Sequence, residues 1–173
     1  MAIYELNSIL RFFRPEQISE RSIEEGEVLF HQGEEAQSIF FVLRGEVRAE
    51  TYLADGKTIV FFRAKEGSAL TEEMLFLDRY LYTAVATVAS TVRMIPKADF
   101  LDKFRREPKF SEALLCCLAE RYSEALMSRE LIGIKSAEDR LLIWLEWRAG
   151  IDGRMIDLSG SMGSISAEVG LTR

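Results

Sequence analysis

The stretch that decides the fold is residues 25–34, EGEVLFHQGE, together with residues 38–47, SIFFVLRGEV. A short apolar run ends at a Gln-Gly turn, and a second, β-rich run ends at another glycine before a third run begins. Glycines at such turns adopt backbone angles that other residues resist. Short strands separated by turns at this spacing predict an antiparallel β-roll.

The same pattern continues along the chain to Pro96. Asp55-Gly56 lies between two of the runs and predicts a tight hairpin turn. Many short strands joined by regular turns are typical of a jelly-roll or double-stranded β-helix. With helices on either side, the fold class is α+β. The predicted strands are residues 28–30, 39–43, 47–53, 58–62, 83–88 and 92–95.

Helical spacing of apolar residues predicts short helices over residues 3–13 and 97–105, and a long one over residues 110–134. The long helix carries a seam with alternating steps of three and four, which is typical of a coiled coil. The stripe could pack on the chain's own roll, or it could pair with a second copy in a homodimer. A second set of apolar residues, which includes Met127 and Leu131, suits a helix that does both. The seam residues are Leu115, Leu118, Tyr122, Ala125, Arg129 and Ile132.

A further helix is predicted over residues 137–148, with Ser136 as its N-cap and Asp139 as the reciprocal acid. Residues 155–158 could form a short strand. These segments follow the long helix directly and begin a separate C-terminal region.

Composition narrows the class of protein. The chain has 173 residues with 48% hydrophobic content, which is enough for a real core. The net charge of −6 gives no support for nucleic-acid binding by the chain as a whole, and such binding would need a local basic patch. No apolar run is long enough for a membrane span, and the N-terminus lacks the features of a signal peptide. A cytoplasmic location is therefore expected.

Few residues could hold a metal ion. Cys116 and Cys117 are the only cysteines and His31 is the only histidine. These residues cannot complete the coordination shell of a metal ion, so no metal site is expected. The chain also lacks a Walker A loop, a Gly-x-Ser-x-Gly motif and a Cys–His couple. Catalytic residues are not expected, and neither is enzyme activity.

The β-roll pattern closely resembles the cyclic-nucleotide-binding-domain family, whose bacterial members are largely CRP/FNR transcription regulators. Residues 67–76, GSALTEEMLF, and residues 81–84, LYTA, resemble the phosphate-binding cassette of that family. There the amides at the start of a short helix hold the cyclic phosphate, a glutamate binds the ribose hydroxyl, and an arginine pairs with the phosphate. The resemblance places an effector pocket at Thr71, Glu72, Glu73, Tyr82 and Thr83.

This chain departs from the cassette at two positions. Thr71 stands where the family has glycine, and Tyr82 stands where it has arginine. Tyrosine supplies no positive charge. Arg79, three residues earlier, would have to reach in from the short helix or loop of the cassette, and Arg63 is another possible cation. The positions that contact adenine in cAMP-responsive members fall on Ala125 and Leu126, which lack hydrogen-bonding side chains. The sequence therefore predicts the fold without strong cAMP binding, and either an unidentified small effector or none. No cofactor is predicted with certainty.

The last residues, 165–173, ISAEVGLTR, resemble the first helix and turn of the family's winged helix-turn-helix. In that match Thr172 caps the recognition helix and Arg173 reaches bases or phosphate in the major groove. The printed sequence ends there, without the rest of the recognition helix and the β-wing. It is either a part of a longer protein or a shortened natural form, and the sequence does not decide between them.

The resemblance implies a homodimeric DNA-binding transcription regulator that binds a palindromic operator, with RNA polymerase as a further partner and no membrane association. The expected domains are a sensor roll at 1–109, a dimerisation helix at 110–134 and a partial helix-turn-helix domain at 135–173. The alternative is a regulatory module that acts on a partner protein without binding DNA. Effector identity and the direction of regulation do not follow from the sequence.

Overall fold

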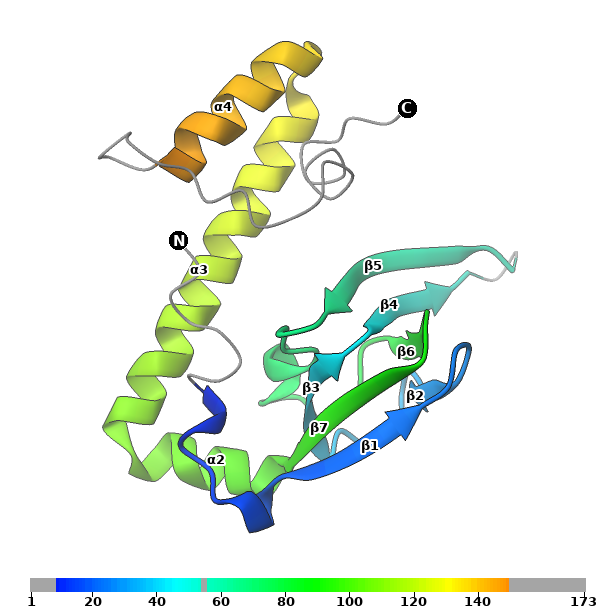
Figure 1. Cartoon of the computed structure of the whole chain (residues 1–173), viewed down its shortest axis with the longest axis vertical. Helices are drawn as coiled ribbons and strands as arrows, with labels where there is room; N and C mark the ends of the chain where they lie inside the picture. Colours follow the sequence, from blue (N-terminus) through cyan, green and yellow to red (C-terminus); the bar gives the residue numbers. More distant parts are fainter. Residues whose placement is uncertain (1–8, 54–55, 150–173) are drawn as a thin grey trace. The chain divides into compact units, whose positions relative to one another are not determined.

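The computed structural model describes residues 9–53 and 56–149. Two antiparallel sheets form the β-roll, one with the order β1-β7-β3 and the other with the order β2-β6-β4-β5. Figure 1 shows β1 beside β7, which continues into α2. The strands are β1 (Ser19–Ile23), β2 (Val28–Phe30), β3 (Ser38–Arg44), β4 (Glu46–Tyr52), β5 (Thr58–Lys65), β6 (Thr83–Ala86) and β7 (Ser90–Pro96).

The helices follow the roll in the order that the periodicity predicts. Short 3-10 helices, η1 and η2, lie before β1 and between β5 and β6. The bounds are η1 (Pro15–Gln17), η2 (Glu72–Met74), α2 (Lys97–Arg106), α3 (Pro108–Gly133) and α4 (Ala137–Ala149). The predicted roll with flanking helices and a long helix after it is confirmed. The expected partial winged helix-turn-helix lies outside the described residues.

The chain forms two compact units, with the boundary inside α3 between Leu114 and Leu115. The roll and α2 belong to the first unit, and most of α3 belongs to the second unit with α4. The boundary follows the sequence pattern, because the aromatic residues that serve the roll end at Phe110.

The turn between β3 and β4 shows why glycine is needed there. Gly45 has φ +87°, and a Cβ atom on it would lie 2.2 Å from Oγ of Ser90. That hydroxyl in turn accepts a hydrogen bond from the amide of Glu46 at 3.1 Å and donates one to the carbonyl of Val88 at 2.7 Å. A side chain at position 45 would therefore separate β3–β4 from the start of β7.

The roll encloses an apolar core built from alternate residues of its strands. Val47, Ala49 and Ala84 face inward and are fully buried. A second cluster of rings fixes α2 and the start of α3 to the roll: Phe100 lies 5.1 Å from Phe110 and 6.3 Å from Phe41, measured between ring centroids. The roll thus has its own closed interior, and the segment that carries the candidate site lines it.

The second unit has a small core of its own. Leu131 of α3 and Trp144 of α4 are buried together, and Met127 packs against them. The amide of Asp139 donates to Oγ of Ser136 at 3.2 Å, which confirms the predicted N-cap of α4. The second apolar face of α3 is therefore covered in part by α4, which periodicity alone did not indicate.

Candidate effector site

The cassette segment is anchored to β3 by hydrogen bonds on both sides of Leu70. The amide of Leu70 donates to the carbonyl of Phe40 at 2.9 Å, and the amide of Phe40 donates to Oγ1 of Thr71 at 2.9 Å. Thr71 is fully buried. The threonine hydroxyl thus satisfies a buried amide that would otherwise carry a desolvation cost.

Thr71 fits the backbone at the position where the family has glycine. Its φ is −137° and its ψ is 19°, and no non-glycine residue among the described ones has a positive φ. The substitution therefore needs no left-handed conformation. η2 begins at the next residue, and its Glu72 is 4% exposed, so a carboxylate is held inside this part of the roll.

Tyr82 lies in the interior of the roll instead of offering a charge to a ligand. The residue is 4% exposed, and its ring centroid lies 5.3 Å from that of Phe62, 6.1 Å from that of Phe61 and 6.0 Å from that of Phe30. Three aromatic side chains from β2 and β5 thus surround the ring. The position that the family match assigns to a phosphate-binding cation holds a packed phenol.

The hydroxyl of Tyr82 ties β6 to the cassette. It donates to the carbonyl of Leu70, and it also lies 2.6 Å from Oε1 of Glu73. Both contacts join the start of β6 to the segment around η2. The structure therefore brings Tyr82 and Glu73 together, as the predicted pocket requires, with each group already bonded to the other.

Burial governs the ionisation of this pair. Burial, and then the nearby carboxylate of Glu73, raises the pKa of Tyr82 far above its ordinary value, so the phenol is neutral. Burial also raises the pKa of Glu73, partly offset by the hydrogen bond from Tyr82. Glu73 is exposed as a residue, while its carboxyl group lies against the hydroxyl of Tyr82.

Thr83 is occupied by a contact to the turn after β2. Its Oγ1 accepts a hydrogen bond from the amide of Gln32 at 3.0 Å, and Oε1 of Gln32 accepts one from Oγ1 of Thr51 at 2.6 Å. Thr83 is buried. Its hydroxyl thus accepts a hydrogen bond from the Gln32-Gly33 turn.

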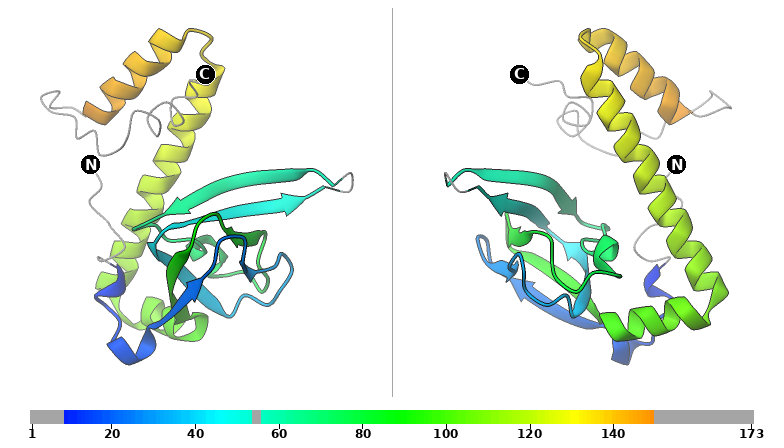
Figure 2. Two further views of the ribbon diagram at one scale, coloured as in Figure 1. Left: turned by 45° about the vertical axis from the view of Figure 1, so that its right-hand side comes forward. Right: turned by 180° about the vertical axis from the view of Figure 1, so that it is seen from behind.

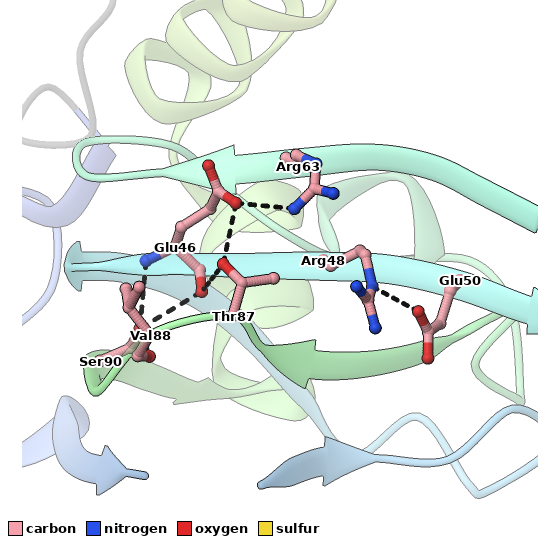
Figure 3. Close-up of polar contacts among 7 residues, drawn as sticks. All are labelled: Glu46, Arg48, Glu50, Arg63, Thr87, Val88 and Ser90. Carbon is pink, nitrogen blue, oxygen red and sulfur yellow. Dashed lines mark hydrogen bonds and ion pairs between the residues drawn. The ribbon is translucent and has the colours of Figure 1, made fainter. Parts of the chain in front are cut away.

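Both arginines suggested as alternative cations have partners elsewhere. Nη1 of Arg79 donates to the carbonyl of Gly33 at 2.6 Å. Nη1 of Arg63 pairs with Oε1 of Glu46 at 2.9 Å, and the same carboxylate accepts a hydrogen bond from Oγ1 of Thr87 at 2.8 Å (Figure 3). The structure therefore assigns neither arginine to the place that Tyr82 occupies.

A buried carboxylate on β4 is a feature that sequence reasoning missed. Glu50 is 2% exposed, forms an ion pair with Arg48 (Figure 3), and accepts a hydrogen bond from the hydroxyl of Tyr52 at 2.7 Å. The available signal was the spacing of two along β4, which places Arg48, Glu50 and Tyr52 on one face. Val47 and Ala49, which belong to the core, lie on the other face of β4, so the carboxylate does not line the core of the roll.

The predicted seam of α3 is largely exposed. Leu115 is 58% exposed and Tyr122 is 66% exposed, and Leu126, which is not a seam residue, is 43% exposed. Ala125 and Arg129 are also exposed, Leu118 is half-buried, and the side chain of Ile132 is not among those described. Large apolar residues along one stripe of a helix are costly to leave in water. Of the two positions matched to adenine contacts, Ala125 belongs to this stripe and Leu126 follows it in the sequence.

Two further expectations concern metals and membranes. The described residues contain no group of three or more His, Cys, Asp or Glu side chains that could hold a metal ion. His31 is exposed. Burial, and then Glu120 and Glu124, raises the pKa of Cys117, which makes it a less reactive thiol.

Within the part of the chain that the structure describes, no helix is long and apolar enough to cross a membrane.

The fold and the cassette segment define a β-roll domain, and comparison with known proteins gives its family. A family model for the cyclic nucleotide-binding domain matches residues 20–107. The chain belongs to this family. It is also 28% identical over 121 residues to the cyclic AMP receptor protein of Thermus thermophilus, which confirms the expected homology to CRP/FNR regulators. That match covers 68% of this chain and 55% of the relative, so the chain spans about half of that protein's length.

Solved structures share the fold. FixK2 from Bradyrhizobium japonicum superposes with a TM-score of 0.62 at 23% identity, covering 90% of this chain and 78% of that one. The catabolite activator protein of Thermus thermophilus gives a TM-score of 0.57 at 22% identity, with coverage of 94% and 79%. A cyclic nucleotide binding protein from Ruegeria pomeroyi gives 0.57 at 25% identity, with coverage of 79% and 61%. The predicted fold class is confirmed.

Proposed function

We propose that this chain contains the sensor and dimerisation parts of a cytoplasmic CRP/FNR-type transcription regulator. The proposed protein is a homodimer that binds a palindromic operator and responds to a small effector other than cAMP, or to none. The proposed domains are the roll at 1–109, the dimerisation helix at 110–134 and the start of the DNA-binding domain at 135–173. RNA polymerase is the further partner that such a role implies.

One observation carries the proposal on effectors. Tyr82 is buried where a phosphate-binding arginine is expected, and its hydroxyl is bonded to Leu70 and Glu73. A cyclic phosphate there would meet a neutral phenol and an acidic side chain without a counter-ion. Leaving a buried charge without its partner costs several kcal/mol, roughly 3–5.

Calorimetry with cAMP tests this part. We expect no binding at micromolar concentrations, and a micromolar or tighter dissociation constant would overturn the proposal. The double variant Thr71→Gly with Tyr82→Arg restores the family residues at both positions and should recover part of the phosphate affinity. Tyr82→Phe is the matched control, since it changes the same residue without adding a charge.

The exposed stripe of α3 supports the homodimer, because pairing with a second copy would bury Leu115 and Tyr122. A two-fold dimer presents two recognition helices to successive major grooves, so half-sites about one helical turn apart are expected. Thr172 and Arg173, the proposed DNA-binding residues, lie outside the described residues.

Footprinting with the full-length protein tests DNA binding. Arg173→Ala should cost roughly 1–3 kcal/mol if the arginine reads a guanine, and the loss should depend on the base at one operator position. A footprint that is asymmetric or indifferent to sequence would remove the helix-turn-helix assignment. It would favour the module that regulates a partner protein.

A further inference from the structure

The contacts of Tyr82 require more protons than the phenol can supply. Its hydroxyl lies within hydrogen-bond distance of the carbonyl of Leu70 and of Oε1 of Glu73. A phenol carries one proton, and a backbone carbonyl only accepts. If Tyr82 donates to Leu70, the second contact is a full hydrogen bond only when the carboxyl group of Glu73 carries a proton of its own.

We propose that Glu73 and Tyr82 form a proton-dependent latch, which holds the η2 cassette against β6 when the carboxyl group is protonated. In the closed state the Glu73 carboxyl donates to Tyr82, and Tyr82 donates to Leu70. When Glu73 releases its proton to solvent, the single phenol proton must serve either the carboxylate or the carbonyl. One of the two connections between β6 and the cassette is then lost.

The surroundings of the pair support this arrangement. The titratable groups that face Tyr82 are Glu73, from η2, and Tyr80, from the segment before β6, and both raise its pKa. The side chains that pack on its ring from β2 and β5 are the uncharged Phe30, Phe61 and Phe62. Burial raises the pKa of Glu73 and outweighs the hydrogen bond from Tyr82, which lowers it, so the net shift has the direction that a protonated carboxyl requires.

The sign of the pH dependence follows from linkage. A carboxyl group whose pKa is higher in the folded than in the unfolded chain stabilises the fold below the unfolded pKa. That contribution is lost as the pH rises through the folded pKa. The latch therefore closes at low pH and opens at high pH. This inference depends on the proposed function only for calling the segment an effector site, and its test uses neither DNA nor a nucleotide.

The test combines two measurements on the whole chain. Carbon-13 NMR of the Glu73 carboxyl, assigned by its absence in Glu73→Gln, should give a titration midpoint above the ordinary value of 4.5. Hydrogen exchange should then follow two amides of the cassette, Leu70 and Met74, which donate to Phe40 and Thr71. Their protection in the wild type, divided by that in Glu73→Gln at the same pH, should fall as the pH rises.

Glu46→Gln is the control, because hydrogen bonds from Thr87 and Arg63 outweigh burial and leave the pKa of Glu46 lowered. This variant should leave the exchange of the cassette amides unchanged at every pH. A Glu73 midpoint at or below 4.5, or a protection ratio that is flat between about pH 4 and pH 8, would overturn the latch. If Glu73→Gln does not fold, Glu73→Ala replaces it in both measurements, because it also removes the carboxyl signal and the contact to Tyr82.

Discussion

The cassette and helix α3 differ in how far their side chains are satisfied by contacts within the chain. In the cassette, the hydroxyls of Thr71 and Tyr82 are bonded within the chain, and a ring fills the position expected for a charge. On α3, large apolar side chains such as Leu115 and Tyr122 stay in solvent. A family member that binds a cyclic nucleotide needs a cassette with a positive charge and hydrogen-bond donors that are free to bind the phosphate. In the described residues, the polar groups of the cassette are therefore satisfied within the chain, whereas the apolar side chains of α3 are not covered.

The first test removes the partner. Tyr122→Glu should place an unpaired charge in the proposed seam and weaken the dimer by about 3 kcal/mol, or roughly 100-fold in dissociation constant. Sedimentation of the wild type and the variant over a concentration series measures the shift. Glu124→Gln is the control at a nearby exposed position. An unchanged dimer in Tyr122→Glu would show that α3 is not the interface.

The second test opens the cassette. Thr71→Val keeps the shape of the side chain and removes the oxygen that accepts from the buried amide of Phe40. An unsatisfied buried donor costs about 1–3 kcal/mol, and the free energy of unfolding should fall by that amount in urea denaturation. Thr91→Val, on the partly exposed β7, is a control that should change stability much less. Equal decreases in the free energy of unfolding in both variants would mean that the hydrogen bond between Phe40 and Thr71 does not stabilise the fold.

The third test acts on the second unit alone. Ser136→Ala removes the cap that accepts from the amide of Asp139 and should destabilise α4 by about 1 kcal/mol. The fluorescence of Trp144, which is buried against Leu131, reports this loss during urea unfolding. The cassette should be unaffected, so a matching loss of protection at Leu70 would show that the two regions unfold together.

The smallest effect concerns pH. Burial alone would raise the pKa of Glu46, but hydrogen bonds from Thr87 and Arg63 leave it below the ordinary value of 4.5. Its contribution to stability is therefore present above pH 4.5 and lost as the pH falls through the folded pKa. Because Arg63 is nearly half exposed, the contribution should be only about 0.5 kcal/mol. Thermal melts of wild type and Glu46→Gln should converge as the pH falls, and divergence would contradict the assignment.

Much of the roll was predictable because its strands are apolar and its turns carry glycine. β1 was missed, since residues 19–23 read Ser-Glu-Arg-Ser-Ile and only Ile23 is buried. The end of β5 was placed too early for a similar reason, because its last residues are mostly charged. Strands whose side chains face water give little periodic signal, and pairing with β7 or β4 decides their extent.

The hydrogen bonds and packing of the candidate site residues could not be predicted from the sequence. The sequence indicates that Tyr82 cannot replace an arginine. It does not indicate that the hydroxyl bonds to Leu70, twelve residues earlier, since that contact depends on how η2 and β6 meet. The burial of Glu50 and the packing of Met127 on Trp144 were missed in the same way. These contacts join segments far apart in the chain or depend on bulges such as the one at β5, and local patterns do not encode them.

The long hairpin of β4 and β5, which Figure 2 shows clearly, carries Phe61 and Phe62 to the ring of Tyr82. Under the proposed function, an effector that binds at the cassette would have to displace this ring from its packed position. The apparent affinity of a ligand is reduced by the fraction of molecules in the state that can bind it. The packing of Tyr82 would therefore exclude weak effectors, and only abundant or tightly binding molecules would act through the cassette.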